Sequence, residues 1–387
     1  MRICGVTFDH TANYGSCLQA YALQHSIEKQ CIGDENCSYQ LIPIKKFKDW
    51  PKVNVWKDIL ISPVLALHRN RFLSFEKKYM RYAPVSSFDE LPKLNETTDA
   101  FVCGSDVIWN PYFNMNQSAF YLDFAEKYRF SYAASFGKKE ISEETLGFIS
   151  PLLNRLDLIS VRDETSRAIV LQCTDKSVAI VADPVLLMNS AEWEQVMEPV
   201  HNEEKYIFVY ATHLNQTIRE FLKKLQKESG CKTVYSAAGP KQALKLRMMN
   251  VQKPGQWLRL IKEAEYVVTN SFHATLFSIL FHRKFFTVVE GEKNKGINVR
   301  MNDFLTQVGL ENRIYSDIPE IIDLSEIDYS YADEEINKIR EESLVFLRKN
   351  LEAAYMEKEK TLSEGRKNNY EDVGKNKKNF TQNSWCL

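Results

Sequence analysis

The chain lacks the features of a membrane-spanning or exported protein. No stretch approaches the roughly 20 apolar residues that a membrane helix requires, and the best candidate, residues 59–67, is interrupted by Ser62 and Pro63. The N-terminal sequence MRICGVTF reads as a strand, without the long apolar core and small-residue cleavage site of a signal peptide. We therefore expect a cytoplasmic protein.

Several function classes lack their signatures. Lys and Arg number 50 against 51 Asp and Glu, whereas nucleic-acid-binding proteins usually carry a basic excess. The 8 cysteines include no CxxC pair, so we expect no metal site and interpret the cysteines as small core residues. HExxH, GxSxG and P-loop motifs are missing too, which argues against zinc proteases, α/β hydrolases and P-loop NTPases.

Strand and helix patterns alternate through most of the 387 residues, and 44% of the residues are hydrophobic. This alternation is typical of a parallel sheet covered by helices, so the predicted fold class is α/β. The strand-like runs form two series, 2–8, 39–44, 100–103, 158–161 and 178–181, then 206–211, 232–235, 266–269 and 285–289.

The segment from Asp183 to Ser190 divides the two series, because a proline follows a strand and an Asn-Ser cap opens the next helix. We predict two doubly wound domains, 1–187 and 188–318, facing a cleft at the carboxyl ends of their strands, where ligands bind in this architecture. A helical segment follows at 319–360, including an amphipathic helix. The polar, Lys- and Asn-rich residues 361–387 are expected to be disordered.

A helical insertion at about 45–84 interrupts the first domain. Its part from 45 to 78 is basic and aromatic, and one interpretation is a helical cover on the domain. The other is peripheral contact with a membrane surface or a lipid-linked acceptor. The aromatic residues concerned are Phe47, Trp50, Trp56, Phe72 and Phe75.

Three loops after strands carry small and polar residues. Asn13-Tyr14-Gly15 precedes a helix starting at Cys17, and such a helix N-terminus can bind an anion, although an ordinary turn capped by Ser16 is equally compatible. This loop has one glycine, whereas the fingerprint of dinucleotide-binding loops has three. The second loop is Gly104-Ser105-Asp106, followed by Trp109. Its polar groups and the Trp109 ring could bind a sugar, or Asp106 could cap a helix while Trp109 fills the core. The third loop contains Ser135 and Gly137 and could admit a phosphate.

Two further strand ends carry chemically active side chains. Arg162 follows a strand, and its guanidinium suits a carboxylate or phosphate, while the adjacent Asp163 can cap the next helix. His273, after Asn270 and Ser271, falls in the first turn of a helix, where the helix dipole disfavours the imidazolium and keeps the ring available as a base. The alternative for His273 is a purely structural role.

Taken in order, these motifs resemble the polysaccharide pyruvyl transferase family. The resemblance covers about residues 1 to 315 and rests on the ordered set rather than on any one motif. Its residues are Asn13-Tyr14-Gly15 with Leu18-Gln19-Ala20-Tyr21, Gly104-Ser105-Asp106 with Trp109-Asn110-Pro111, residues 131–137, Ser160-Val161-Arg162-Asp163, Asp183-Pro184, Ser271-Phe272-His273 and Arg300.

The resemblance implies a GT-B-like arrangement of two Rossmann-like domains. It also implies transfer of pyruvate from phosphoenolpyruvate to a saccharide, as a ketal, during surface-polysaccharide synthesis, with no further cofactor. His273, Arg162 and Asp106 would then be catalytic, with Arg300 helping to hold the donor. One departure is Ser271, where some relatives carry an arginine.

Two alternatives remain open. One is a GT-B-type glycosyltransferase that uses a nucleotide sugar, with Glu290, Gly291 and Glu292 near the ribose. The other is a relative that binds a glycan without turning it over. The acceptor saccharide could be free or lipid-linked.

Overall fold

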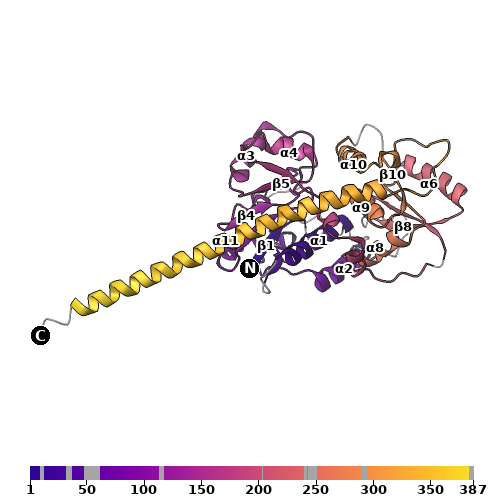
Figure 1. Ribbon diagram of the computed structural model, residues 1–387. Coiled ribbons are helices and arrows are strands. Elements are labelled where there is room, and N and C mark those ends of the chain that lie inside the picture. The colour runs from indigo at the N-terminus through magenta and orange to yellow at the C-terminus, as the bar shows by residue number, and fades with distance from the viewer. Residues whose placement is uncertain are drawn as a thin grey trace.

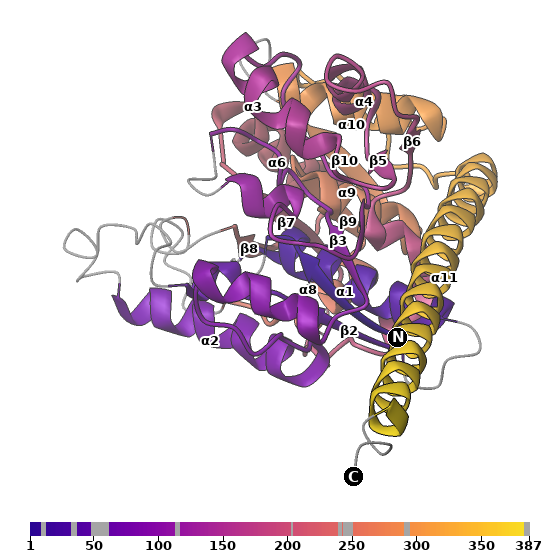
Figure 2. The same cartoon turned by 90° about the vertical axis from the view of Figure 1, so that its left-hand side faces the viewer.

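The computed structural model describes residues 1–8, 13–31, 37–47, 62–112, 117–202, 204–238, 242, 251–289 and 295–382. Two parallel sheets, each covered by helices, make up the body of the molecule (Figure 1, Figure 2). The predicted fold class is therefore confirmed: the chain is α/β, with two doubly wound halves.

The N-terminal sheet has the strand order β2-β1-β3-β4. Two bridges, Phe130 to Leu158 and Ala134 to Val161, extend it to a further parallel pair, β5 and β6. The order 2-1-3-4-5-6 places a topological switch point between β1 and β3. The strands are β1 (Arg2–Val6), β2 (Ser38–Leu41), β3 (Ala100–Cys103), β4 (Tyr128–Ser131), β5 (Ile159–Val161) and β6 (Val178–Ile180).

Two buried serines join β4 to β5. Ser131 Oγ donates to the carbonyl of Ser160 at 2.9 Å, and Ser160 Oγ donates to the carbonyl of Ser131 at 2.8 Å. The amide of Ser160 in turn donates to Ser131 Oγ. These reciprocal bonds satisfy backbone groups that would otherwise be buried without partners, and they fix the end of β5, from which Arg162 extends.

The C-terminal sheet has the order β11-β10-β9-β7-β8, again fully parallel. Counted from its first strand this is 2-1-3-4-5, so a second switch point lies between β7 and β9. Its elements are β7 (Tyr206–Ala211), α6 (Gln216–Ser229), β8 (Lys232–Ala237), α8 (Pro254–Glu263), β9 (Tyr266–Thr269), α9 (Phe272–Leu280), β10 (Lys284–Val288), α10 (Lys295–Gln307), η8 (Glu311–Arg313) and β11 (Ile314–Tyr315).

Helix α1 (Tyr14–Gln30) lies between the two halves and is buried around almost its whole circumference. It contacts α8 and α9 of the C-terminal half as well as β2 and η6 (Pro184–Leu187). A helix that is buried on all sides needs no polar face. This explains why α1 contains few charged residues and many apolar ones, such as Leu18, Ala22 and Leu23. The remaining N-terminal elements are η1 (Ile44–Lys46), η4 (Phe88–Glu96), η5 (Gln117–Tyr121), α3 (Glu143–Leu153), α4 (Glu164–Val170) and α5 (Ser190–Glu194).

The described part of the insertion is a helical cover. Helix α2 (Ser62–Tyr79) packs on α1 and α8 and buries Phe72 and Phe75. Phe47 is buried as well. Trp50 and Trp56 lie outside the described residues, so the membrane interpretation is not tested by this packing.

Helix α11 (Ser330–Gln382) spans both halves and then projects beyond them (Figure 1). It starts at the C-terminal half, where His282 Nε2 lies 2.9 Å from Asp333, and it reaches the N-terminal half, where Ser343 Oγ accepts from the amide of Ala182. The helix continues through residues 361–382, where the sequence predicted disorder. This stretch contains no proline, although two glycines and four asparagines lower its helix propensity.

The cysteines follow the expectation in part. Cys4, Cys17, Cys103 and Cys173 are buried thiols. The end of α1 and the start of β2 bring the pair Cys31–Cys37 together with a Cα–Cα distance of 6.1 Å, and these two form a disulfide that the sequence analysis did not expect. Within the described ranges, no helix is long and apolar enough to cross a membrane.

Candidate active site

The candidate site lies where strand ends of the two halves meet. Arg162 follows β5, Asp183 follows β6, and His273 sits in the first turn of α9 after β9. Carboxyl ends of parallel strands are where ligands bind in doubly wound folds. Side chains from two separately folded halves therefore converge at one place.

Asp183 connects these residues. Its Oδ2 accepts from Arg162 Nη1 at 2.6 Å and lies 3.4 Å from His273 Nε2, while its Oδ1 accepts from the amide of Val185. The carboxylate is 1% exposed. Burial alone would raise its pKa, but the charges and hydrogen bonds of His273 and Arg162 outweigh burial and hold the pKa of Asp183 well below its usual range. Asp183 is thus a carboxylate at neutral pH.

His273 is held from both sides. Ser271 caps α9 by accepting from the amide of Ala274, which sets the start of the helix. Nε2 of His273 faces Asp183, and the opposite edge of the ring packs against Gly15, where a Cβ atom would come within 2.2 Å of Nδ1. Only a residue without a side chain fits there, so Gly15 serves the contact between α1 and the imidazole.

Asp106 has both carboxylate oxygens engaged. Oδ2 accepts from Ser16 Oγ and Oδ1 from the amide of Val107, each at 2.8 Å, and Oδ1 is 4.0 Å from Arg162 Nη2. The backbone of Asp106 has φ 76°, a left-handed conformation that costs energy in a residue with a side chain and that clusters at functional sites. This geometry connects the β3 loop to α1 and Arg162.

Two arginines flank the ring of Phe272, with guanidinium carbons 5.2 Å (Arg162) and 6.0 Å (Arg300) from its centre. Burial acts to lower the pKa of Arg162, but Asp183, Asp106 and Asp163 raise it overall. Burial, followed by repulsion from Arg162, lowers the pKa of Arg300 to about 10, so Arg300 stays protonated at neutral pH. Its Nε is buried without a hydrogen-bond partner, and it forms no ion pair with a described residue.

Tyr14 and Trp109, which the sequence analysis placed at the substrate, are core residues. Tyr14 stacks on Trp257 at 4.9 Å and donates to the carbonyl of Gln252, and so connects the two halves. Trp109 stacks on Tyr121, and its Nε1 donates to the carbonyl of Phe120. Both rings are covered on their faces, so neither can stack on a sugar. For Trp109 the structure shows the core-filling alternative.

The small residues of the strand-end loops shape the backbone. Gly104 has φ 130°, and a Cβ there would lie 1.9 Å from the carbonyl oxygen of Tyr132. Ser105 is fully buried. Ser135 Oγ donates to Asp163 at 2.7 Å and accepts from the amide of Gly137, which has φ 63°. These residues support the site and offer little surface to a ligand.

Three polar residues cap or connect elements at the same edge. Asn13 accepts from the amide of Ser16 and caps α1. Asn270 Oδ1 accepts from the amide of Thr212 at 2.7 Å, which bridges the ends of β9 and β7. Ser271 caps α9, and Arg300 brings a guanidinium to the neighbouring Phe272 ring.

Sequence reasoning did not place Asp183 or Phe272 in the site. Asp183 was interpreted as part of a domain seam and as one motif of the resemblance, although an acid shortly after a strand follows the same pattern that singled out Arg162. Phe272 gave no signal of its own, because an aromatic residue in a helix is most often core. Among the described residues, no three His, Cys, Asp or Glu side chains form a metal-binding cluster.

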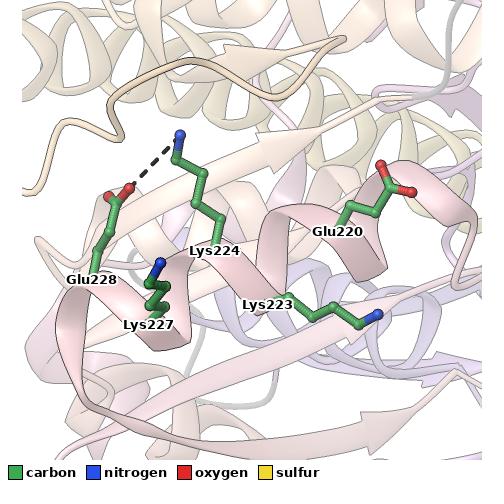
Figure 3. A pocket seen from close by; sticks show the side chains of 5 residues that line it. All are labelled: Glu220, Lys223, Lys224, Lys227 and Glu228. Atoms are coloured by element: carbon green, nitrogen blue, oxygen red, sulfur yellow. Dashed lines mark ion pairs between the residues drawn. The ribbon is translucent and has the colours of Figure 1, made fainter.

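A separate depression lies on the outer side of α6. Lysines and glutamates of successive turns line it, and Lys224 Nζ lies 3.7 Å from Glu228 (Figure 3). Such a face is typical of a solvated helix with i,i+4 pairs. Its residues are Glu220, Lys223, Lys224, Lys227 and Glu228, none of which belongs to the candidate site.

Three solved structures similar to the chain have low sequence identity to it. The S. aureus MnaA–UDP structure is 11% identical with a TM-score of 0.46, covering 88% of this chain and 96% of its own. The UDP-GlcNAc 2-epimerase of Neisseria meningitidis is 12% identical with a TM-score of 0.45 (89% and 100% covered). The E. coli heptosyltransferase WaaC is 13% identical with a TM-score of 0.40 (87% and 99% covered). At this level of likeness nothing about activity follows.

No curated protein matches the chain. A family model does, described as polysaccharide pyruvyl transferase, and it matches residues 13–291. The match begins at the cap of α1 and includes Asp106, Arg162, Asp183 and His273. It extends over more than half of the sequence, and the chain belongs to the polysaccharide pyruvyl transferase family.

Proposed function

We propose that this transferase moves the pyruvyl group of phosphoenolpyruvate to a saccharide as a ketal during surface-polysaccharide synthesis. The observation that carries the proposal is Arg300, whose Nε is buried without a hydrogen-bond partner and which forms no ion pair with a described carboxylate, beside the Phe272 ring next to His273. A buried charge without a partner is costly. An anionic donor supplies the missing partner.

The two arginines have different roles in this proposal. Arg162 is already bound to Asp183 and lies near Asp106, so its charge is largely compensated within the protein. Arg300 is free to bind the phosphate or carboxylate of the donor, and its guanidinium suits either group. This assignment also explains how the chain manages with Ser271 where some relatives carry arginine.

The chemistry requires two bond-forming steps at C2 of phosphoenolpyruvate. The oxygen of one sugar hydroxyl bonds to C2, its proton leaves to a base, and C3 takes up a proton to become a methyl group. The oxygen of a second hydroxyl then bonds to C2, its proton leaves, and the C2–O bond to phosphate breaks. The products are a cyclic ketal and inorganic phosphate.

His273 is the residue we assign to proton transfer, because its imidazole is the group at the site that can both accept and donate a proton near neutral pH. Asp106 holds Ser16 and the backbone of Val107 with its two oxygens, so we assign it to positioning and not to the catalytic role that the resemblance implied. Arg300 stabilises charge that develops on the leaving phosphate.

A lipid-linked acceptor would bring the protein to the inner face of a membrane. Support for this part of the proposal is the basic and aromatic composition of residues 45–78. Sedimentation with vesicles that carry anionic lipids, compared with neutral vesicles, tests it. Equal recovery in the supernatant with both kinds of vesicle would remove peripheral membrane contact from the proposal.

The activity test incubates the purified protein with phosphoenolpyruvate and a panel of nitrophenyl and lipid-linked sugars. We expect acceptor-dependent phosphate release, a product heavier by one pyruvate ketal, and no product with His273→Ala. Absence of turnover, together with thermal stabilisation by a nucleotide sugar and not by phosphoenolpyruvate, would instead favour the glycosyltransferase alternative. The residues invoked for that alternative, 290–292, lie outside the described residues.

A further inference from the structure

We propose that Ser343 of the C-terminal helix α11 is a positioning residue of the candidate site, because it holds the chain segment that presents Asp183 to Arg162. Arg340, one turn earlier in α11, holds the other end of the same segment. Both residues lie outside the part of the chain that the family model matches. The effect on turnover rests on the proposed function, whereas the positioning of Asp183 can be tested without any substrate.

The first argument is the point at which the sheet stops supporting the segment. The amide of Val181 still donates to the carbonyl of Val161 at 3.0 Å, which continues the pairing of β5 with β6. The next amide, that of Ala182, donates instead to Ser343 Oγ at 2.8 Å. Ala182 is buried, and a buried amide needs a partner. At the residue directly before Asp183, α11 supplies that partner.

The second argument is that α11 also holds the segment on the far side of Asp183. Arg340 Nε donates to the carbonyl of Leu186 at 2.6 Å. Between the two contacts with α11, Asp183 caps η6, and its Oδ1 accepts from the amide of Val185. The helix therefore contacts the chain on both sides of the carboxylate.

The third argument is the task of the carboxylate at the site. Asp183 Oδ2 accepts from Arg162 Nη1 at 2.6 Å in a position that is 1% exposed. Arg162 lies against the ring of Phe272, which Arg300 also approaches. A buried ion pair is favourable only while its geometry is well kept. A shift of the segment would therefore displace the guanidinium of Arg162 at the candidate site.

The competing explanation is that Ser343 only attaches α11 to the N-terminal half, and Asn350 separates the two explanations. Like Ser343, Asn350 is buried and donates to the carbonyl four residues earlier in α11. It also accepts from the N-terminal half, in this case from the hydroxyl of Tyr128 at 3.3 Å. Tyr128 begins β4, at the opposite edge of the parallel sheet from the candidate site. Loss of this contact loosens α11 without touching the segment of Asp183.

The amide of Val185 reports the position of the carboxylate, because it donates to Asp183 Oδ1 at 3.0 Å. The experiment measures hydrogen exchange at this amide in the parent protein, Ser343→Ala and Asn350→Ala. We expect exchange about tenfold faster in Ser343→Ala, the loss of one hydrogen bond to a charged group, and the parent rate in Asn350→Ala. The parent rate in folded Ser343→Ala, or equal acceleration in both variants, would overturn the proposal.

A second variant, Arg340→Met, covers the case that Ser343→Ala does not fold. It removes the contact with Leu186 and leaves the bond between Ala182 and Ser343 in place. We expect exchange at the Val185 amide to become faster in this variant too. The parent rate in folded Arg340→Met would contradict positioning of the segment by α11.

Turnover is the second readout. We expect kcat/KM for phosphoenolpyruvate to fall about 10- to 100-fold in Ser343→Ala, since a misplacement of about 1 Å can cost that much, and to keep its parent value in Asn350→Ala. An unchanged value in Ser343→Ala, or an equal fall in both variants, would leave Ser343 with attachment alone. If exchange behaves as expected while the parent does not turn over phosphoenolpyruvate, the proposed function fails and the positioning of Asp183 stands.

Discussion

The guanidinium of Arg300 lies 6.0 Å from the centre of the Phe272 ring, and no described carboxylate pairs with it. Arg300→Met should therefore stabilise the fold by about 1 kcal/mol, because it removes a charge that has no partner from the interior. The same change should raise the donor KM about 10- to 100-fold, the cost of losing a charged hydrogen bond. Urea unfolding and steady-state kinetics measure the two effects.

Arg313→Met is the matched control for that substitution. Arg313 is 4% exposed and is paired with Asp323, so its replacement should not stabilise the protein and should leave the donor KM unchanged. Stabilisation without loss of donor affinity in Arg300→Met would show that Arg300 does not bind the donor.

Trp109→Ala should act on stability. The ring is fully buried against Tyr121, so its removal should lower the free energy of unfolding by about 3 to 5 kcal/mol. Trp109→Phe, which keeps most of the packing, should leave the acceptor KM unchanged. If the acceptor KM rises strongly in Trp109→Phe while stability is nearly unchanged, the Trp109 ring contacts the acceptor after all.

Tyr14→Phe should likewise affect stability and not binding. The variant keeps the stack on Trp257 but loses the hydrogen bond to the carbonyl of Gln252, which costs about 1 kcal/mol. We expect the melting temperature to fall with both KM values unchanged. A donor KM that changes tenfold would mean that the hydroxyl reaches the ligand.

The contribution of Asp183 to stability should depend on pH. Its pKa in the folded state is below the ordinary value of 3.8, so the stabilisation is fully present above about pH 5 and declines as the pH falls through and below 3.8. Asp183→Asn should cost about 3 to 5 kcal/mol at pH 7, because Arg162 is left buried without its carboxylate. The difference from the parent should narrow below pH 4.

Urea unfolding of both proteins at a series of pH values tests this prediction, since the titration of other acids cancels in the difference. A difference between the proteins that stays constant down to pH 3 would contradict the low pKa of Asp183.

The sequence predicted the architecture well because hydrophobic periodicity and the residues that form turns and caps are local properties of the chain. Buried strands such as Tyr206–Ala211 stand out as apolar runs, and alternation with helices implies parallel sheets. The disulfide between Cys31 and Cys37 was not predicted, since six residues of separation do not fix the path of the intervening chain.

The site was predicted in outline but not in its connections. Strand-end position correctly brought Arg162, Asp106 and His273 to one place, since this follows from the sheet alone. Whether an aromatic near a strand end faces a ligand or the core depends on the packing of distant elements, so the sequence left both interpretations of Trp109 open. The role of Gly15 depends on a contact across the two halves, which no local pattern encodes.

Helix α11 accepts a hydrogen bond through Ser343 from Ala182, the residue directly before Asp183, and its far end stands clear of the body (Figure 1). Before the outer turns reach Ser343, the helix is held against the N-terminal sheet, where Lys358 pairs with Asp99 and Tyr128 of β4 donates to Asn350 Oδ1 at 3.3 Å. A load on the outer turns would therefore meet the N-terminal sheet first, and the residue next to Asp183 only after it.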